Sequence, residues 1–347
     1  MFYTERSKKM KKVLSIMLVL VLVLSMFTAC GGGNEEPEAT GEGGGPEYTI
    51  RFAHIENEFT ACAQGVQLFK KYVEEGSDGR IAVEILGSGS MGGEREIIES
   101  ITMGNLEAGM AMSSLLTTYL PDWNIFDLPF VFKDRADWAA KVDGELGKLL
   151  ADETSSIHLK VLSYFDGGFR VISNNKRPIV TMDDTKGIKV RVGESTLMID
   201  TEKALGTNPI PMAFGEIYTA LQQGTIDGVD TSVVYVMDGN FQEVTKYCSL
   251  TNHSALQMVT FINQDYFDSL PEDLQQVILD AAAKTTVEQR QIAVEVDEQA
   301  MQVMKDAGME INEISDDVKQ QMIEATKPVA EGYRDQIDPK VFEAAGF

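Results

Sequence analysis

The most restrictive feature of this sequence is a helical pattern that is too long for one small domain. Ser269-Leu270-Pro271-Glu272 has a capping-box composition with proline in the first turn, which is typical of a helix start. The pattern continues to Gly308. At 1.5 Å per residue, such a helix would be about 55 Å long. We therefore expect it to straddle two domains, and the fold to consist of two lobes that share this helix.

The chain before residue 113 alternates between strand and helix patterns. Apolar residues recur at every second position in the strands, and every three or four positions in the helices. The patterns predict strands at 48–53, 81–85 and 108–112, and helices at 62–73 and 94–103. This β-α-β-α-β order is typical of a parallel sheet that is covered by helices.

A second α/β set follows the glycines at 167 and 168. A helix at 134–151 and a strand at 159–165 lead into it; its predicted strands are 170–173, 188–192, 209–212, about 229, 246–250 and 256–262, and its helices are 195–205 and 215–223. The expected division of the chain is residues 48–167 plus 257–296 for lobe I, and residues 168–256 plus 297–347 for lobe II. Ligands of open α/β sheets bind beyond the carboxyl ends of the strands, and domain interfaces are preferred pockets. The predicted site is therefore a cleft between the lobes.

The first residues have the layout of a secretory signal. A cluster of four lysines precedes the apolar run Val13 to Phe27, which ends at Thr28-Ala29-Cys30. We expect residues 1–29 to be a lipoprotein signal peptide, Cys30 to be lipidated, and residues 30–47, poor in apolar side chains, to be a flexible tether. The alternative is a transmembrane anchor, but the apolar run is shorter than the ~20 residues that a span needs. The expected location is extracytoplasmic, on a membrane through a lipid.

Charge and cysteine content exclude several classes of protein. The formal net charge is -24, so nucleic acid is an implausible partner, because phosphate contacts need clustered lysine and arginine. Besides Cys30, only Cys62 and Cys248 are present, which is too few for a disulfide framework. The three histidines, at 54, 158 and 253, also lie far apart in the sequence. We expect neither a metal site nor a cofactor.

One motif suggests an enzyme. Residues 87–92 match G-x-G-x-x-G between a strand and a helix, with Glu107 further on, as in dinucleotide-binding loops. Glu94 and Glu96 would repel a pyrophosphate from the helix start, and the loop follows the second strand rather than the first. A flexible turn is the favoured interpretation; an NAD-dependent oxidoreductase is the alternative. Because no other catalytic motif is present, we expect the protein not to be an enzyme.

Several ordered motifs then point to one family. They are Gly168-Phe169-Arg170, the run from Asp184 to Val192, Pro209-Ile210-Pro211-Met212-Ala213-Phe214, and the run from Glu216 to Gly224 with Ile226-Asp227-Gly228. This stretch resembles the solute receptors of tripartite ATP-independent periplasmic (TRAP) transporters, of the dicarboxylate-receptor (DctP) type. Weaker similarity covers about 48–347. The resemblance implies a two-lobed α/β fold like that of type II periplasmic binding proteins, with transporter membrane subunits as partners.

The resemblance also implies roles for individual residues. Arg191 would bind the carboxylate of an organic acid, Arg170 would assist it, and Phe214 would pack on the ligand. Many relatives have an asparagine where this chain has Thr231, so a known ligand cannot simply be transferred. Four further residues could line the opposite lobe: Asn57, Glu58, Ser113 and Arg95.

Physical chemistry supports the assignment of Arg191. This arginine interrupts the apolar strand 188–192, and a guanidinium is rarely buried without a partner. Its planar fork fits a carboxylate through two parallel hydrogen bonds. The alternative is an internal ion pair with one of the 54 acidic residues. Salt screens the overall negative charge beyond ~8 Å, so a local pair of arginines can still attract an anion.

The sequence thus predicts a transport receptor for a small organic acid. A sugar acid such as a hexuronate is the first expectation, and a C4-dicarboxylate the second. The first alternative is a sensor that presents the same acid to a signalling partner, and the second is the oxidoreductase considered above.

Overall fold

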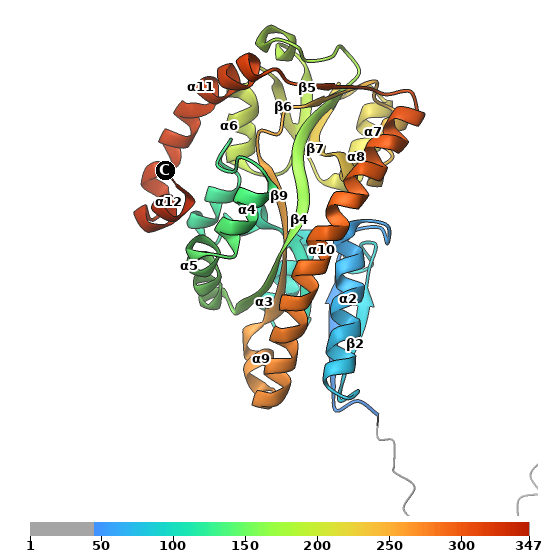
Figure 1. The fold of residues 1–347 in the computed structure, drawn as a ribbon, viewed down its shortest axis with the longest axis vertical. Helices are drawn as coiled ribbons and strands as arrows, with labels where there is room; N and C mark the ends of the chain where they lie inside the picture. Colours follow the sequence, from blue (N-terminus) through green and yellow to red (C-terminus); the bar gives the residue numbers. More distant parts are fainter. Residues whose placement is uncertain (1–44, 347) are drawn as a thin grey trace, which may run out of the picture. The chain divides into compact units, whose positions relative to one another are not determined.

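The computed structural model describes residues 45–346, and their strands form a ten-stranded sheet (Figure 1). The strands are β1 (Tyr48–Ala53), β2 (Ile81–Leu86), β3 (Ala108–Met112), β4 (Leu159–Asn174), β5 (Lys189–Val192), β6 (Asn208–Pro211), β7 (Gly228–Ser232), β8 (Tyr247–Leu250), β9 (Ala255–Asn263) and β10 (Glu310–Glu313). Their order is β2-β1-β3-β9-β4-β7-β5-β6, and β8 joins β4 to β10. The sheet is therefore continuous across both predicted α/β sets.

Helices cover this sheet. They are α2 (Ala61–Gly76), α3 (Glu94–Thr102), α4 (Arg135–Val142), α5 (Glu145–Glu153), α6 (Thr196–Ala204), α7 (Ile217–Gln222), α8 (Val233–Asp238), α9 (Gln264–Ser269), α10 (Glu272–Asp306), α11 (Asp316–Tyr333) and α12 (Pro339–Ala345). Among the described residues, no helix is both long enough and apolar enough to cross a membrane.

The first α/β set folds as the sequence predicts. β1 pairs in parallel with β2 and β3, and α2 and α3 are the intervening helices. The apolar stripe of α2, which includes Cys62, Val66, Phe69 and Val73, is buried in one core cluster with Phe52 of β1. The predicted parallel sheet with helical cover is confirmed.

β4 is one strand where the sequence pattern predicted two. It continues through Gly167 and Gly168, where its pairing with β9 shifts register between Asp166 and Phe169. Gly168 has a φ of 89°, which side chains disfavour and glycine accepts. The glycines therefore form an irregularity within a strand, and the prediction of a break was wrong. The first part of β4 pairs with β9, whereas the second part pairs with β7 and β8.

The long helix is confirmed as α10, which has 35 residues. This helix packs against α2 and β4 and also against α8, so it contacts elements of both α/β sets (Figure 1). The length of this helix predicted a two-lobed α/β architecture. The similarity of the chain to solved structures of periplasmic solute-binding proteins, described below, confirms this prediction. The lobe boundaries proposed from the sequence remain a proposal.

Other segments differ from the prediction. The helix expected at 134–151 is two helices, α4 and α5, because Asp143 ends the first and Gly144 is the N-cap of the second. A Cβ at Gly144 would lie 2.9 Å from the Ala140 carbonyl oxygen, so glycine is needed at this corner. Helices α8, α9, α11 and α12 and strand β10 were not anticipated.

The N-terminal predictions fall mostly outside the structure. The signal peptide at 1–29, Cys30 and most of the tether at 30–47 lie outside the described residues. The last tether residue, Glu47, is described and accepts a hydrogen bond from Arg80 Nε at 3.0 Å.

Candidate functional site

Two neighbouring cavities lie at the carboxyl ends of strands from both α/β sets. The inner cavity has a volume of about 40 Å³ and the outer one about 570 Å³, and Arg191 and Phe214 line both. On one side the lining follows β1, β2 and β3; on the other it follows β5, β6 and β7. This is the edge at which open α/β sheets bind ligands.

Arg191 is held with part of its guanidinium free. Its side chain belongs to β5 and is only 7% exposed. Nε and Nη2 both donate to the Met212 carbonyl oxygen, at 2.9 and 2.7 Å. Within the described residues, Arg191 has no ion pair within 4.0 Å, so the internal pair considered as the alternative is not seen for it. Burial, and secondarily Arg170, lowers the pKa of Arg191 to about 10, which still leaves it charged at neutral pH.

Arg170 differs because it has an internal partner. Its Nη1 lies 3.4 Å from Asp230 Oδ1 and donates to the Asp230 carbonyl oxygen at 3.3 Å. Its Nη2 contacts the Met112 sulfur at 3.2 Å, and its Nε has no hydrogen-bond partner. At 2% exposure it lines the inner cavity, where its charge is largely balanced by Asp230.

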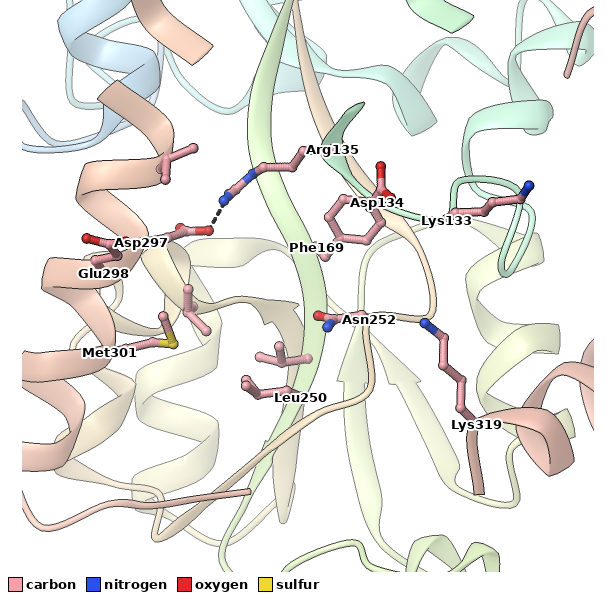
Figure 2. A pocket seen from close by; sticks show the side chains of 13 residues that line it. Lys133, Asp134, Arg135, Phe169, Leu250, Asn252, Asp297, Glu298, Met301 and Lys319 are labelled. Atoms are coloured by element: carbon pink, nitrogen blue, oxygen red, sulfur yellow. Dashed lines mark hydrogen bonds and ion pairs between the residues drawn. The ribbon is translucent and has the colours of Figure 1, made fainter. Parts of the chain in front are cut away.

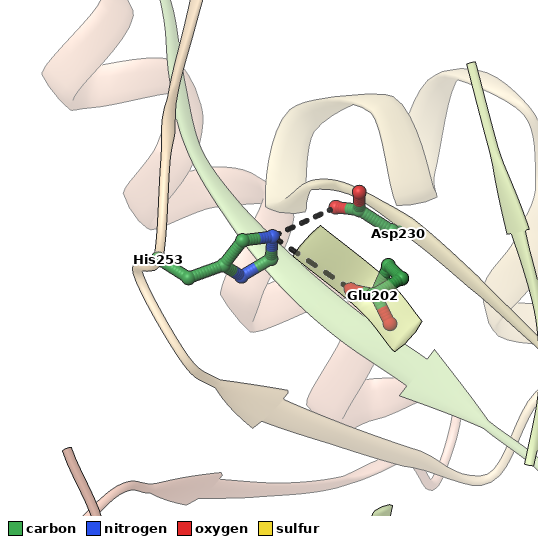
Figure 3. A group of neighbouring side chains, drawn as sticks. All are labelled: Glu202, Asp230 and His253. Carbon is green, nitrogen blue, oxygen red and sulfur yellow. Dashed lines mark ion pairs between the residues drawn. The ribbon is translucent and has the colours of Figure 1, made fainter. Parts of the chain in front are cut away.

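Asp230 joins Arg170 to a buried group made of His253 and Glu202 (Figure 3). His253 Nε2 lies 3.5 Å from Asp230 Oδ1 and 3.8 Å from Glu202 Oε1. The pKa of Asp230 is lowered to about 2, since Arg170 and His253 outweigh its burial, whereas burial and Asp230 raise the pKa of Glu202 to about 7.

The three side chains have ligand atoms within 4.8 Å of one another, a spacing at which a metal ion could be held. The guanidinium of Arg170 already supplies positive charge next to Asp230. The arrangement therefore fits a network that fixes Arg170, and the expectation of no metal site stays a prediction.

Acidic side chains line the opposite part of the inner cavity. Glu56 is buried after β1, and Tyr235 Oη donates to its Oε1 at 2.6 Å. Asp238 lies one helical turn beyond Tyr235 in α8, and Asn57 Nδ2 donates to its Oδ1 at 2.8 Å. Burial raises the pKa of Glu56 to about 8, against the hydrogen bond from Tyr235, and burial also raises the pKa of Asp238.

These raised pKa values predict a pH dependence of stability. Between its unfolded pKa near 4.5 and its folded pKa of about 8, Glu56 binds more protons in the folded state, so stability is lost as the pH rises through this range. Asp127 and Glu202, with pKa values of about 7, act in the same direction. We expect the melting temperature of the ligand-free protein to fall by several degrees between pH 6.5 and 8.5.

This dependence is measurable by thermal denaturation in buffers matched for ionic strength. His54, whose pKa is lowered by burial, acts in the opposite direction below pH 6.5, which is why the range starts there. Glu56→Gln should flatten the profile, and a profile that rises with pH would contradict the assignment.

An aromatic wall completes the inner cavity. The Phe214 ring packs edge-on against Tyr235, with ring centroids 6.0 Å apart, and tilted against Phe241 at 5.5 Å. Thr231 of β7 lines the same cavity, and its hydroxyl makes no side-chain hydrogen bond among the described residues. The structure thus brings together Arg191, Arg170, Phe214 and Thr231 in one cavity, and their role in ligand binding stays a prediction.

The remaining predicted residues are placed differently. Arg95 lines only the outer cavity, where it lies 4.0 Å from Glu194 across the opening. Asn57 is exposed and bonded to Asp238 rather than lining either cavity. Glu58, in the loop after β1, is exposed and lines neither cavity. Ser113 is fully buried and accepts a hydrogen bond from Gln257, so it also lines neither.

The glycine-rich loop at 87–92 is a turn between β2 and α3, as favoured above. Gly89 and Gly92 have positive φ and line the outer cavity. Glu94 and Glu96 occupy the first turn of α3, where they disfavour a phosphate.

Sequence reasoning missed Glu56, Tyr235 and the network of His253. Glu56 and Tyr235 are separated by 179 positions, so no local pattern links them. For Glu56, the signal in the sequence was a charged residue three positions after a predicted strand, a pattern that is also common on surfaces.

Another cavity, of about 380 Å³, lies on the other face of β4 (Figure 2). Phe169 and Val171 line it, while Arg170 between them faces the inner cavity, as strand alternation requires. Figure 2 shows Arg135 reaching across β4 to Asp297 on α10. Arg135 Nε also donates to Asp166 Oδ2 at 2.7 Å. The Arg135 side chain thus connects the first turn of α4 to β4 and to the long helix α10.

Comparisons with known proteins agree with this geometry. The family model for bacterial extracellular solute-binding proteins of family 7 (DctP) matches residues 52–336. The 2,3-diketo-L-gulonate-binding periplasmic protein YiaO of Escherichia coli is 30% identical over 76% of this chain and 80% of its own length.

Two crystal structures illustrate the structural similarity. The sugar acid binding protein DctPAm of Advenella mimigardefordensis, in complex with galactonate, has 30% identity and a TM-score of 0.82, covering 87% of this chain and 98% of its own. A TRAP periplasmic solute binding protein of Sulfurospirillum deleyianum, with bound succinate, has 28% identity and a TM-score of 0.81, covering 86% and 97%.

Proposed function

The chain belongs to the bacterial extracellular solute-binding proteins of family 7 and is a TRAP-type receptor, and from this premise we propose that its ligand is a sugar acid whose carboxylate binds Arg191. Members of this family bind solutes outside the cytoplasm and are not enzymes. The oxidoreductase alternative is thereby replaced by a binding function.

The observation that carries this proposal is the free edge of the Arg191 guanidinium. The Met212 carbonyl oxygen occupies the Nε–Nη2 edge, so the Nη1–Nη2 edge is left without a partner among the described residues. Two parallel donors in a buried cavity fit a carboxylate with geometric specificity. The positive charge of this side chain is uncompensated within 4.0 Å, which favours an anionic ligand.

Binding can be coupled to closure of the cavity. Glu56 with Tyr235, Asn57 with Asp238 and Arg95 with Glu194 are pairs that join its two sides. A ligand that touches both sides stabilises the joined state relative to an open one. In this proposal the closed receptor then docks on the membrane subunits of its transporter.

Sugar acids are favoured over C4-dicarboxylates as the ligand class, although structural relatives with both are known. One relative binds galactonate and another has bound succinate. In this chain Thr231 and Tyr235 place hydroxyl groups around the cavity, and these suit a polyhydroxylated ligand.

A ligand screen tests the proposed function. We expect D-galactonate or D-glucuronate to raise the melting temperature, and isothermal calorimetry to give a 1:1 complex. NAD is the negative control for the glycine loop. Two outcomes would reject the proposal: stabilisation by NAD without stabilisation by any carboxylate, or a screen in which no organic acid stabilises the protein.

The lipid anchor also remains a proposal. It rests on Thr28-Ala29-Cys30 after the apolar run, which is typical of lipoprotein processing. Mass spectrometry of the mature N-terminus tests it: a diacylglyceryl group on Cys30 supports the anchor, and an unmodified N-terminus at another residue contradicts it.

A further inference from the structure

The inner cavity is lined by both basic and acidic side chains. Their arrangement offers a partner for one ligand carboxylate but not for two. Arg170 is paired with Asp230 at 3.4 Å, whereas the Nη1–Nη2 edge of Arg191 has no partner among residues 45–346. Three carboxyl groups, those of Glu56, Glu94 and Asp238, line the same cavity. The cavity therefore offers one site for a ligand carboxylate, at Arg191. Around this site, Glu56, Glu94 and Asp238 form a wall of hydrogen-bond acceptors, which we call the acidic wall.

The acceptors of this wall are incompletely used. Oε1 of Glu94 accepts from the Met112 backbone N–H at 2.8 Å, and no described residue donates to its Oε2. Asp238 likewise receives Asn57 on Oδ1 alone. Glu56 accepts from Tyr235 and from Thr60, which leaves further lone pairs on its carboxyl oxygens. Donors from water or from a ligand can satisfy these acceptors.

A hydroxyl group supplies such a donor, whereas a carboxylate supplies none. A second carboxylate in this cavity would lie near the carboxyl groups of Glu94 and Asp238, and repulsion between like charges in a poorly solvated cavity disfavours binding. Glu56, with a pKa of about 8, accepts or donates to a hydroxyl in either protonation state. The wall therefore fits the hydroxylated part of a ligand whose single carboxylate is on Arg191.

We propose that Glu56, Asp238 and Glu94 determine specificity by binding ligand hydroxyl groups and excluding a second carboxylate, so that this receptor prefers hydroxylated monocarboxylates to dicarboxylates. This inference rests on the proposed function, because it presumes that an organic acid binds through Arg191.

Four-carbon ligands of matched length provide the test. Calorimetry on the wild-type protein compares D-erythronate, which has hydroxyl groups, with succinate, which has a second carboxylate, and with 4-aminobutanoate, which has an ammonium group. We expect D-erythronate to bind at least about tenfold more tightly than either of the others. A preference for succinate or for 4-aminobutanoate would overturn the inference while leaving an organic-acid receptor intact.

Variants locate the effect. Glu56→Gln keeps an oxygen that accepts from Tyr235 and replaces the oxygen that accepts from Thr60 with an amide nitrogen, and Asp238→Asn is likewise isosteric. Each should bring the ratio of D-erythronate to succinate affinity down at least about threefold. Glu58→Gln is the matched control, because Glu58 is exposed and lines neither cavity, and its ratio should equal that of the wild type.

An unchanged ratio in both cavity variants would overturn the role of the acidic wall. If neither these ligands nor D-galactonate binds to the folded wild-type protein, the proposed function itself fails, and this inference fails with it. The wild-type comparison needs no variant, so the inference stays testable even if Glu56→Gln does not fold.

Discussion

Arg191→Lys is expected to weaken organic-acid binding by about 30- to 150-fold while leaving the melting temperature of the ligand-free protein within a few degrees. Lysine keeps the positive charge but loses the planar fork, and a single ammonium cannot bond both the Met212 carbonyl oxygen and two carboxylate oxygens in the same geometry. The expected factor corresponds to ~2–3 kcal/mol at about 1.4 kcal/mol per tenfold change. Calorimetry with D-galactonate measures it.

Arg80→Lys is the control for this substitution. Arg80 forms hydrogen bonds with the carboxylates of Glu47 and Asp273 and lines neither cavity. Its replacement should leave the affinity unchanged. Equal affinity of Arg191→Lys and wild type would remove the basis of the proposed ligand site.

Arg135→Met is expected to have the largest effect on stability, lowering the free energy of unfolding by ~2–3 kcal/mol. The change leaves the nearly buried Asp166 and the partly buried Asp297 without their shared cation, and breaking a buried ion pair costs more than the pair contributes. Arg135 itself is 30% exposed, and for this reason we place the effect below the upper range for fully buried pairs. The shift in the midpoint of urea denaturation measures it.

The double variant Arg135→Met/Asp297→Asn separates this mechanism from a loss of packing. Burial raises the pKa of Asp297 to about 6 even with Arg135 present, so removing its charge should recover part of the lost stability. No recovery in the double variant would indicate that the methylene groups of Arg135, rather than its charge, stabilise the region.

The local sequence pattern was sufficient to predict those strands and helices that bury one apolar face. The strand and helix positions between Tyr48 and Met112 follow from alternation and from the stripe of α2. It was insufficient at Gly167 and Gly168, because a glycine pair signals a turn in a sequence but can also be an irregularity inside a strand that is paired on both sides. The second interpretation depends on partners such as β9, which only the fold supplies.

The residues of the candidate site also fall into two groups, those that the sequence made recognisable and those that it did not. Arg191 was recognisable because a charged residue in an apolar strand is unusual and because the surrounding motif resembles a family. His253 and Glu56 were not recognisable, since their significance comes from contacts with Asp230 and Tyr235 that bring distant parts of the chain together. Burial and shared partners, rather than residue type, mark these positions.

The uninterrupted course of β4 has a practical consequence for dissecting this protein. Its first part completes a ladder with β9 and its second part completes ladders with β7 and β8. A truncated fragment that ends near Gly168 would present unpaired backbone groups along a strand edge, and such edges promote aggregation. Separate expression of either half is therefore expected to give insoluble material, and ligand binding has to be studied on the intact chain.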